Sequence, residues 1–185
     1  MLELALIAIG LLMLAALAVS WIGSRLPAAH RARSQLLLAA TPEAVYARVS
    51  DVARFGQWRT DVTAVEPLPP ENGEAGFRLT DRNGTIRYRI ERAEPPFSFV
   101  TRIADTDLGF RGRWTITIEP DGSGSRVRIT EDGEVTSPLF RFFSRYVFGH
   151  YRTQEAYLTA LAASFGETAR SERLPEPEPA ARDAR

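Results

Sequence analysis

The chain has 185 residues, enough for one domain of ordinary size with short appendages, and 44% of them are hydrophobic, enough for a substantial core. Its formal net charge is zero, which argues against a nucleic-acid-binding protein, because such proteins carry a clear basic excess. The chain contains no cysteine, which excludes disulfides, thiolate metal sites and cysteine nucleophiles.

The first stretch of the chain predicts a transmembrane anchor over residues 1–24. The segment Leu4–Ile22 contains no charged side chain, and as a helix with a rise of ~1.5 Å per residue it would span roughly the hydrocarbon thickness of a bilayer. The alternative is a signal peptide cleaved after 16–18 (Ala-Leu-Ala), with a mature chain that begins near Val19. Glu3 and the lack of a basic side chain before the apolar run favour the anchor.

A basic juxtamembrane stalk is expected over residues 25–33, which include Arg25, His30, Arg31 and Arg33. By the positive-inside rule these residues place the rest of the chain in the cytoplasm. All 23 basic residues are arginine, a bias typical of a GC-rich bacterial genome. We therefore expect a single-pass protein of the inner (cytoplasmic) membrane. A secreted or periplasmic protein remains the alternative if the first segment is a signal peptide.

The folded domain is expected over residues 34–168. Thr41-Pro42 starts a helix, with threonine as N-cap and proline at the first helical position, and a second short helical piece follows over 52–58. Asn83-Gly84 is the strongest hairpin signal in the chain. Alternating or β-rich segments predict a series of antiparallel strands: Gln35–Ala40, Val62–Leu68, Phe77–Thr80, Thr85–Glu91, Phe97–Ile103, Phe110–Glu119 and Arg126–Thr130.

The segment Pro138–Phe165 follows the strands and has aromatic and aliphatic residues at helical spacing, which predicts one long helix that ends at Gly166. Several antiparallel strands with one apolar face, closed by a long helix, make an α+β domain. Residues 169–185 alternate proline with glutamate and are expected to be a disordered tail.

The order of these features resembles the polyketide cyclase/dehydrase-like (SRPBCC) branch of the START-like superfamily. The stretch TPEAVYARVSDVARFGQWRTDVTAVE is similar to the opening of that branch. The prolines at 95–96, the hairpin GFRGRWTITIEPDGSGSRVRITEDGEV and the aromatic C-terminal helix follow in the family's order over roughly 34–168. The resemblance implies the helix-grip fold, in which a curved antiparallel sheet surrounds the long helix and encloses a cavity for apolar ligands.

Strand parity and helical spacing predict that a set of mainly aromatic side chains lines or plugs one internal space: Trp58, Tyr88, Phe99, Trp114, Tyr146, His150 and Tyr157. A structural role is favoured for His150 over a role as general acid or base. The carboxylates at 131, 132 and 134 flank a turn signal and are interpreted as solvated turn residues. The sequence therefore assigns no catalytic residue, no metal ligand and no cofactor.

The sequence favours a membrane-anchored domain that binds an apolar small molecule, of the lipid or quinone class, without transforming it. One alternative is a polyketide cyclase/dehydratase-like enzyme, in which His150, Tyr146 and Tyr88 would move protons. Another is a protein-interaction scaffold that uses the Pro/Glu tail.

Overall fold

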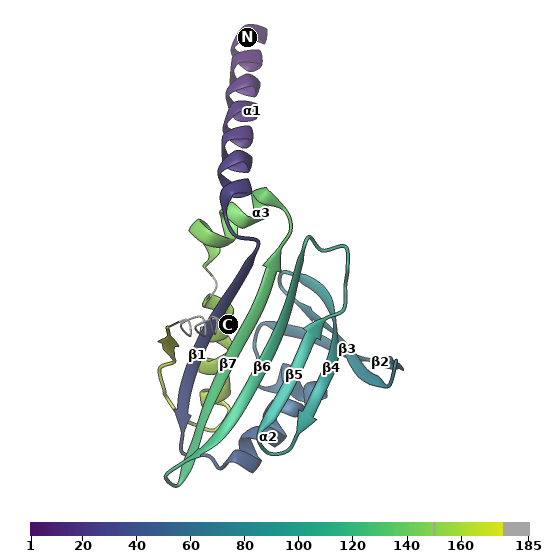
Figure 1. The fold of residues 1–185 in the computed structure, drawn as a ribbon, viewed down its shortest axis with the longest axis vertical. Coiled ribbons are helices and arrows are strands. Elements are labelled where there is room, and N and C mark those ends of the chain that lie inside the picture. The colour runs from purple at the N-terminus through teal and green to yellow at the C-terminus, as the bar shows by residue number, and fades with distance from the viewer. Residues whose placement is uncertain (150, 176–185) are drawn as a thin grey trace, which may run out of the picture.

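The computed structural model describes residues 1–149 and 151–175 of the chain. One long helix precedes an antiparallel sheet that is interrupted by helical segments (Figure 1). The elements, in chain order, are α1 (Leu2–Arg25), β1 (Ala29–Leu38), α2 (Pro42–Ser50), η1 (Val52–Gln57), β2 (Val62–Glu71), β3 (Glu74–Asp81), β4 (Gly84–Glu94), β5 (Ser98–Ile103), β6 (Phe110–Asp121), β7 (Gly124–Val135), α3 (Pro138–Phe143), η2 (Ser144–Phe148), α4 (Arg152–Ala163) and β8 (Glu172–Leu174).

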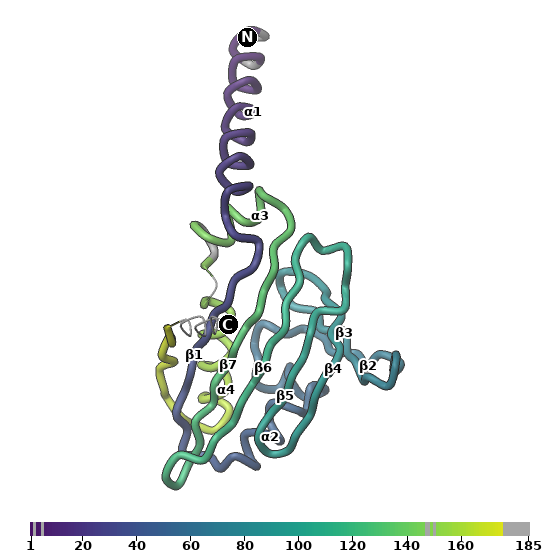
Figure 2. The backbone as a smooth tube through the Cα atoms, viewed as in Figure 1, coloured from purple at the N-terminus to yellow at the C-terminus, as the bar shows by residue number. Residues whose placement is uncertain are grey.

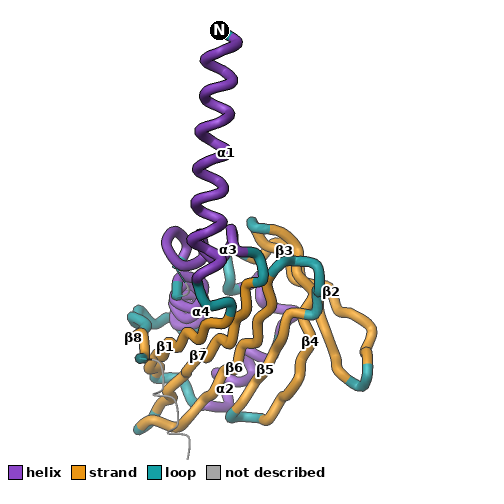
Figure 3. Tube along the Cα trace, turned by 45° about the horizontal axis from the view of Figure 1, so that its top comes forward, coloured by secondary structure: helices purple, strands orange, loops and turns teal. Residues whose placement is uncertain are grey.

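The strands form one eight-stranded sheet in the order β2-β3-β4-β5-β6-β7-β1-β8, and every neighbouring pair is antiparallel. The sheet curves, and α2 and α4 both lie behind it in Figure 3, on the face that we call the inner face. The expected α+β helix-grip architecture is therefore confirmed. The core lies between this face and the two helices, and its fully buried side chains include Leu36, Ile118, Ile129, Leu158 and Leu161.

The local signals at turns and caps act as expected. The Thr41 hydroxyl accepts a hydrogen bond from the backbone N–H of Ala44 at 3.4 Å and caps α2. The carboxylate of Asp81 accepts from the backbone N–H groups of Asn83 and Gly84, which closes the predicted β3–β4 hairpin. Strand β2 runs further than expected and includes three prolines, which is tolerated because β2 is the edge of the sheet.

The stretch expected to be a basic stalk, residues 25–33, is largely part of the sheet. Strand β1 begins at Ala29 and pairs with β7 from Ala29 opposite Glu134 to Leu38 opposite Ser125. Only residues 26–28 connect α1 to β1, and Figure 2 shows the backbone running from one into the other. The stalk expectation is wrong because residues 29–33 belong to a strand that pairs with β7 and buries Ala32 between the arginines.

The expected single helix over Pro138–Phe165 is broken into three pieces. α3 continues into the π-helical turn η2, and Gly149 then takes φ 71° and ψ 153°, which is not helical. α4 starts afresh at Arg152 and is the part that packs against the sheet. Residues before and after the break therefore no longer share a face, so the helical spacing that aligned Tyr146 with Tyr157 has no structural meaning.

Part of the expected disordered tail is ordered. Strand β8 pairs with β1 through Arg33, Ser34 and Gln35, and the Gln35 side-chain amide donates to Glu172 at 2.7 Å. Arg173 adds an ion pair with Glu155 of α4. The free edge of β1 accounts for this difference, because it offers backbone partners that composition does not reveal. Residues 176–185, the rest of the tail, lie outside the described residues.

Helix α1 extends away from the sheet (Figure 1). Its segment Leu6–Arg25 has a mean hydropathy of 2.4 and is long enough to span a membrane, and only 6% of it is buried. An N-terminal apolar helix of this kind is consistent with an anchor or with a signal peptide.

Candidate functional site

The inner face of the sheet carries the candidate site, and strand register determines which side chains share it. Directly opposed residues of antiparallel strands point to the same face. Glu131 on β7 stands opposite both Ala32 of β1 and Trp114 of β6, and Trp114 stands opposite Thr101 of β5. These residues therefore form one row across the inner face, with Ile90 of β4 beyond Thr101.

An aromatic cluster fills the space between this row and α4. The Tyr157 ring of α4 meets Trp58 and Trp114 edge to face, with centroid distances of 5.2 Å and 5.6 Å. Phe55 contacts Trp58 at 5.6 Å and Phe77 at 6.1 Å. Phe77 in turn stacks on Tyr88 at 5.2 Å. The aromatic cluster, defined as Phe55, Trp58, Phe77, Tyr88, Trp114 and Tyr157, is thus a continuous chain of ring contacts.

Four of the predicted site residues are in this cluster, and a fifth is beside it. Trp58 and Tyr157 are buried, whereas Tyr88 and Trp114 are partly exposed. Phe99 lies in the core, opposite Ile116 on the same face. Because the rings contact one another, they fill the deep part of the inner face instead of surrounding one large cavity.

Of the remaining two predicted residues, Tyr146 lies away from the cluster. The Tyr146 side chain on η2 is 60% exposed and contacts Phe142 at a centroid distance of 5.1 Å. The break at Gly149 separates it from α4, which is why its helical spacing misled the prediction. His150 lies outside the described residues.

Several polar atoms beneath α4 are buried and have no hydrogen-bond partner among the described residues: Ser34 Oγ, Trp58 Nε1, Gln154 Oε1 and the Tyr157 hydroxyl. Three further atoms of this kind, Arg89 Nε, Ser98 Oγ and Arg128 Nε, belong to strand residues elsewhere in the sheet. Burial of an unpaired polar group is unfavourable by about 1–3 kcal/mol, so the four atoms around α4 make this region a candidate binding surface. Burial raises the pKa of Tyr88 to about 12 and also raises the pKa of Tyr157. Both phenols are therefore protonated at neutral pH and can donate hydrogen bonds.

A polar group lies beside the aromatic cluster in the same row. His30 Nε2 is 3.5 Å from Glu131 Oε1, and the Gln154 amide donates to Glu131 Oε2 at 3.4 Å and to the Ala32 carbonyl at 3.2 Å. The imidazole of His30 lies where a side chain on Gly133 would project, so glycine at 133 makes room for it. We call His30, Glu131 and Gln154 the polar triad.

Comparison with known proteins gives the family. Residues 29–165 match the family model described as polyketide cyclase / dehydrase and lipid transport. The chain belongs to this family. The matched region starts where β1 starts, so the family domain includes residues 29–33 and not only the expected 34–168.

Solved structures of low sequence identity share the family's fold. A START superfamily protein from Mycobacterium smegmatis matches with a TM-score of 0.59 and 20% identity over 73% of this chain and 96% of that one. The Zhui aromatase/cyclase from Streptomyces sp. R1128 matches with a TM-score of 0.59 and 15% identity, over 74% of this chain and 93% of that one. A truncated norcoclaurine synthase from Thalictrum flavum matches with a TM-score of 0.58 and 13% identity, over 72% of this chain and 91% of that one. No curated protein matches the sequence.

In this polyketide cyclase/dehydrase family domain, two members of the polar triad lie elsewhere than the sequence predicts. Glu131 was interpreted as a solvated turn residue, but it lies in the middle of β7, which continues to Val135. His30 was assigned to the stalk, but it is paired with Gly133 inside the sheet. In the sequence, Val127 and Ile129 alternate with polar residues. The same alternation, continued by two residues, predicts that Glu131 lies on the apolar face.

The outer face of the family's sheet carries ion pairs. Arg113 binds Glu91 through two hydrogen bonds, at 2.6 Å and 3.0 Å, and Arg87 pairs with Asp105. Two hollows on this face are lined mainly by charged and hydroxyl side chains, among them Arg33, Arg113 and Thr115. Arg87 and Arg113 are therefore solvated and ion-paired. No group of three or more potential metal ligands occurs in the described part of the chain.

Proposed function

We propose that this chain is a membrane-anchored member of the family that binds an apolar small molecule with a hydrogen-bonding group, of the lipid or isoprenoid quinone class. The observation that carries the proposal is the combination of aromatic surface and unpaired polar atoms on the inner face. The ligand's apolar body would lie against the partly exposed Tyr88 and Trp114. Its polar group would meet the Tyr157 hydroxyl or the polar triad.

A bound ligand would give the buried, unpaired Tyr157 hydroxyl a hydrogen-bond partner that the described residues do not supply. An apolar site with a few convergent polar atoms is the usual composition of a small-molecule site, and the polar atoms give orientation. The described aromatic cluster occupies the deep part of the face, so the ligand's place is the partly exposed half around Trp114, Gly112 and Ile103.

Retention of α1 is supported by its contacts with the domain. Gly23 is buried against the backbone of Pro138 at the start of α3, and the Leu26 carbonyl just after α1 accepts from Arg141 at 3.4 Å. A signal peptide is removed from the mature protein and gains nothing from such contacts. With the arginines downstream of α1, this supports an anchored domain that faces the cytoplasm.

Purification of the full chain in mild detergent, followed by mass spectrometry of extracted small molecules, tests the binding proposal. Gly112→Leu adds a side chain on the inner face beside Ile103. A Cβ atom at position 112 would already lie 3.4 Å from Ile103 Cδ1, so the rest of the leucine would fill the space next to it. Arg111→Leu, one residue away on the opposite face, is the matched control. A specific ligand should co-purify with the wild type and with Arg111→Leu, and should be lost from Gly112→Leu. Equal recovery from all three would mean that the molecule is bound elsewhere, for example around α1.

The polar triad favours a second candidate, a cyclase/dehydratase-like enzyme. An imidazole next to a carboxylate on a ligand-facing surface is a suitable general acid–base pair, which typically contributes 10²–10⁴-fold to a rate. Under this candidate Glu131→Gln would abolish turnover of an identified ligand but leave its binding within a few-fold. The identified ligand is incubated with wild-type protein and extracted again. If it is recovered chemically unchanged, and Glu131→Gln changes only its affinity, binding without reaction is the function.

A further inference from the structure

The segment formed by α3 and η2, which we call the interfacial segment, exposes large apolar side chains outside the core. It covers Pro138–Phe148 and has no buried residue in α3. Contiguous exposed apolar residues on a folded domain indicate a surface that contacts something apolar. The exposed side chains, with their exposed fractions, are Leu139 (41%), Phe140 (51%), Phe143 (38%) and Tyr146 (60%).

This segment is attached to the end of α1. Gly23 and Pro138 touch so closely that a side chain at position 23 would overlap the Pro138 carbonyl. Arg141 fixes the arrangement, since it donates to the carbonyls of Val135 at 2.7 Å, Thr136 at 3.1 Å and Leu26 at 3.4 Å. Figures 1 and 3 both show α3 beside the domain-proximal end of α1. If α1 spans a bilayer, the interfacial segment lies at the membrane surface.

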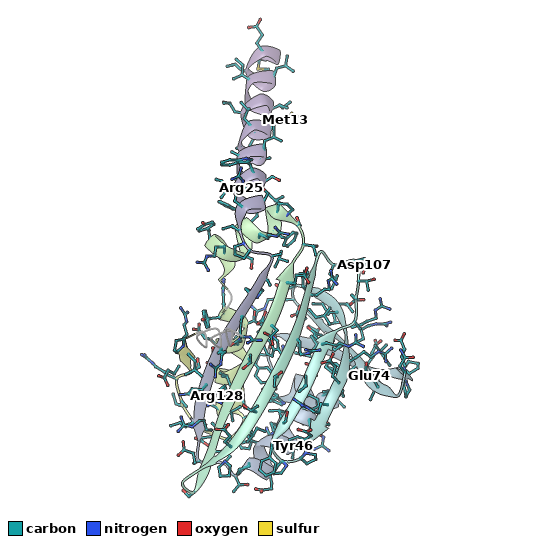
Figure 4. The ribbon with its side chains drawn as sticks, viewed as in Figure 1. Met13, Arg25, Tyr46, Glu74, Asp107 and Arg128 are labelled. Carbon is teal, nitrogen blue, oxygen red and sulfur yellow. The ribbon has the colours of Figure 1, made fainter. Side chains whose placement is uncertain are left out.

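The charges and aromatic residues at this level match an anionic membrane surface. The Arg25 guanidinium lies 4.8 Å from the ring centre of Trp21, near the end of the apolar span. Arg145 is exposed on η2 between the exposed apolar residues. Tryptophan and tyrosine concentrate at membrane–water interfaces, and exposed arginines there bind anionic headgroups. Figure 4 shows Arg25 where α1 meets α3, and Tyr46 at the opposite end of the domain.

The inner face becomes more exposed toward the same end. Along β6, Ile118 is fully buried and Ile116 is 4% exposed, whereas Trp114, Gly112 and Phe110 are partly exposed. Phe110 stands opposite the last residue of β7, three residues before α3 begins. The accessible half of the proposed ligand site is therefore the half nearest the interfacial segment.

We propose that the interfacial segment is a second membrane contact, which lies at the headgroup–acyl boundary of an anionic bilayer and holds the accessible end of the inner face against it. A ligand then passes between lipid and protein without crossing water. This inference rests on the proposed membrane anchoring by α1, but it adds a contact that an anchor on a flexible connection would not make.

Because the chain has no cysteine, single nitroxide labels measure the depth of each position in the full protein. We would label Leu12→Cys in α1, Phe140→Cys in α3 and, as control, Phe97→Cys, an exposed phenylalanine (56%) whose carbonyl pairs with Ile118 at the buried end of the sheet. The protein is placed in nanodiscs of phosphatidylcholine with or without phosphatidylglycerol. Collision with oxygen, which concentrates in lipid, is compared with collision with a water-soluble nickel chelate.

The labels at positions 12 and 140 should collide more with oxygen, and the label at position 97 more with the nickel chelate. Phosphatidylglycerol should move the label at position 140 deeper, and Arg145→Gln should reduce that shift, whereas Arg111→Gln on the outer face should not. Position 12 in lipid with position 140 in water would overturn the inference and leave the anchor intact. Position 12 in water would overturn both. A label at position 140 shielded from both reagents would indicate a protein partner or a second copy instead of lipid, and would also overturn it.

Discussion

The unpaired hydroxyl of Tyr157 gives the sharpest test of the candidate site, through the substitution Tyr157→Phe. The side chain is 5% exposed, its ring is held between Trp58 and Trp114, and its oxygen has no partner among the described residues. In an ordinary buried tyrosine, loss of the hydroxyl removes a hydrogen bond and destabilises the protein. Here it removes only an unsatisfied polar atom, whose burial is unfavourable by about 1–3 kcal/mol.

We therefore expect Tyr157→Phe to stabilise the ligand-free protein by about 1 kcal/mol, which raises Tm by roughly 2–4 °C for a protein of this size. Ligand affinity should fall about 2- to 12-fold, the factor that corresponds to the loss of one hydrogen bond of about 0.5–1.5 kcal/mol. Thermal unfolding of the full chain, followed by near-ultraviolet circular dichroism, measures the first quantity, and titration with the extracted ligand measures the second. Tyr46→Phe, on a partly exposed tyrosine of α2, is the control and should change neither.

Stabilisation together with weaker binding would identify the hydroxyl as a ligand group. If Tyr157→Phe lowered stability by more than about 1 kcal/mol, the hydroxyl would have a structural partner. The unpaired-atom argument for a ligand site would then fail at this residue.

Two further perturbations follow from the same structure. Burial raises the pKa of Tyr88 from 10.0 to about 12, so its contribution to stability is complete below pH 10 and is lost as pH rises toward 12. Chemical denaturation measures the free energy of unfolding at pH 8 and at pH 11. Its decrease between the two pH values should be about 1.4 kcal/mol smaller in Tyr88→Phe than in the wild type. Equal decreases would contradict the burial of the Tyr88 hydroxyl. Gly23→Ala should separate α3 from α1, detected as faster hydrogen exchange at the α3 amides in nanodiscs, because the new Cβ would overlap Pro138. Gly10→Ala, where nothing lies within 4 Å, should leave that exchange unchanged, and the same result for both variants would argue against the α1–α3 contact.

The sequence by itself determined the α+β class, the apolar first helix and the inward parity of three strands. These features depend on local periodicity: alternation on β6 places Trp114 with Ile116 and Ile118, and the hairpin at Asn83-Gly84 depends on turn chemistry within four residues. The same alternation places Tyr88 and Phe99 on the inner face, where their strand partners Phe77 and Ile116 also lie. Trp58 and Tyr157 are both buried, and their contact with each other joins residues about a hundred positions apart.

Tertiary structure alone decided where the polar groups of the site lie. Glu131 and His30 are far apart in the sequence and come within 3.5 Å of each other only because β7 returns to pair with β1. The chain leaves the helical conformation at Gly149, and Arg141 holds α3 to the carbonyls of Val135, Thr136 and Leu26. The helical spacing within the segment reveals neither feature. Periodicity specifies which side of an element is apolar, whereas the pairing of distant elements determines which polar groups are brought against that side.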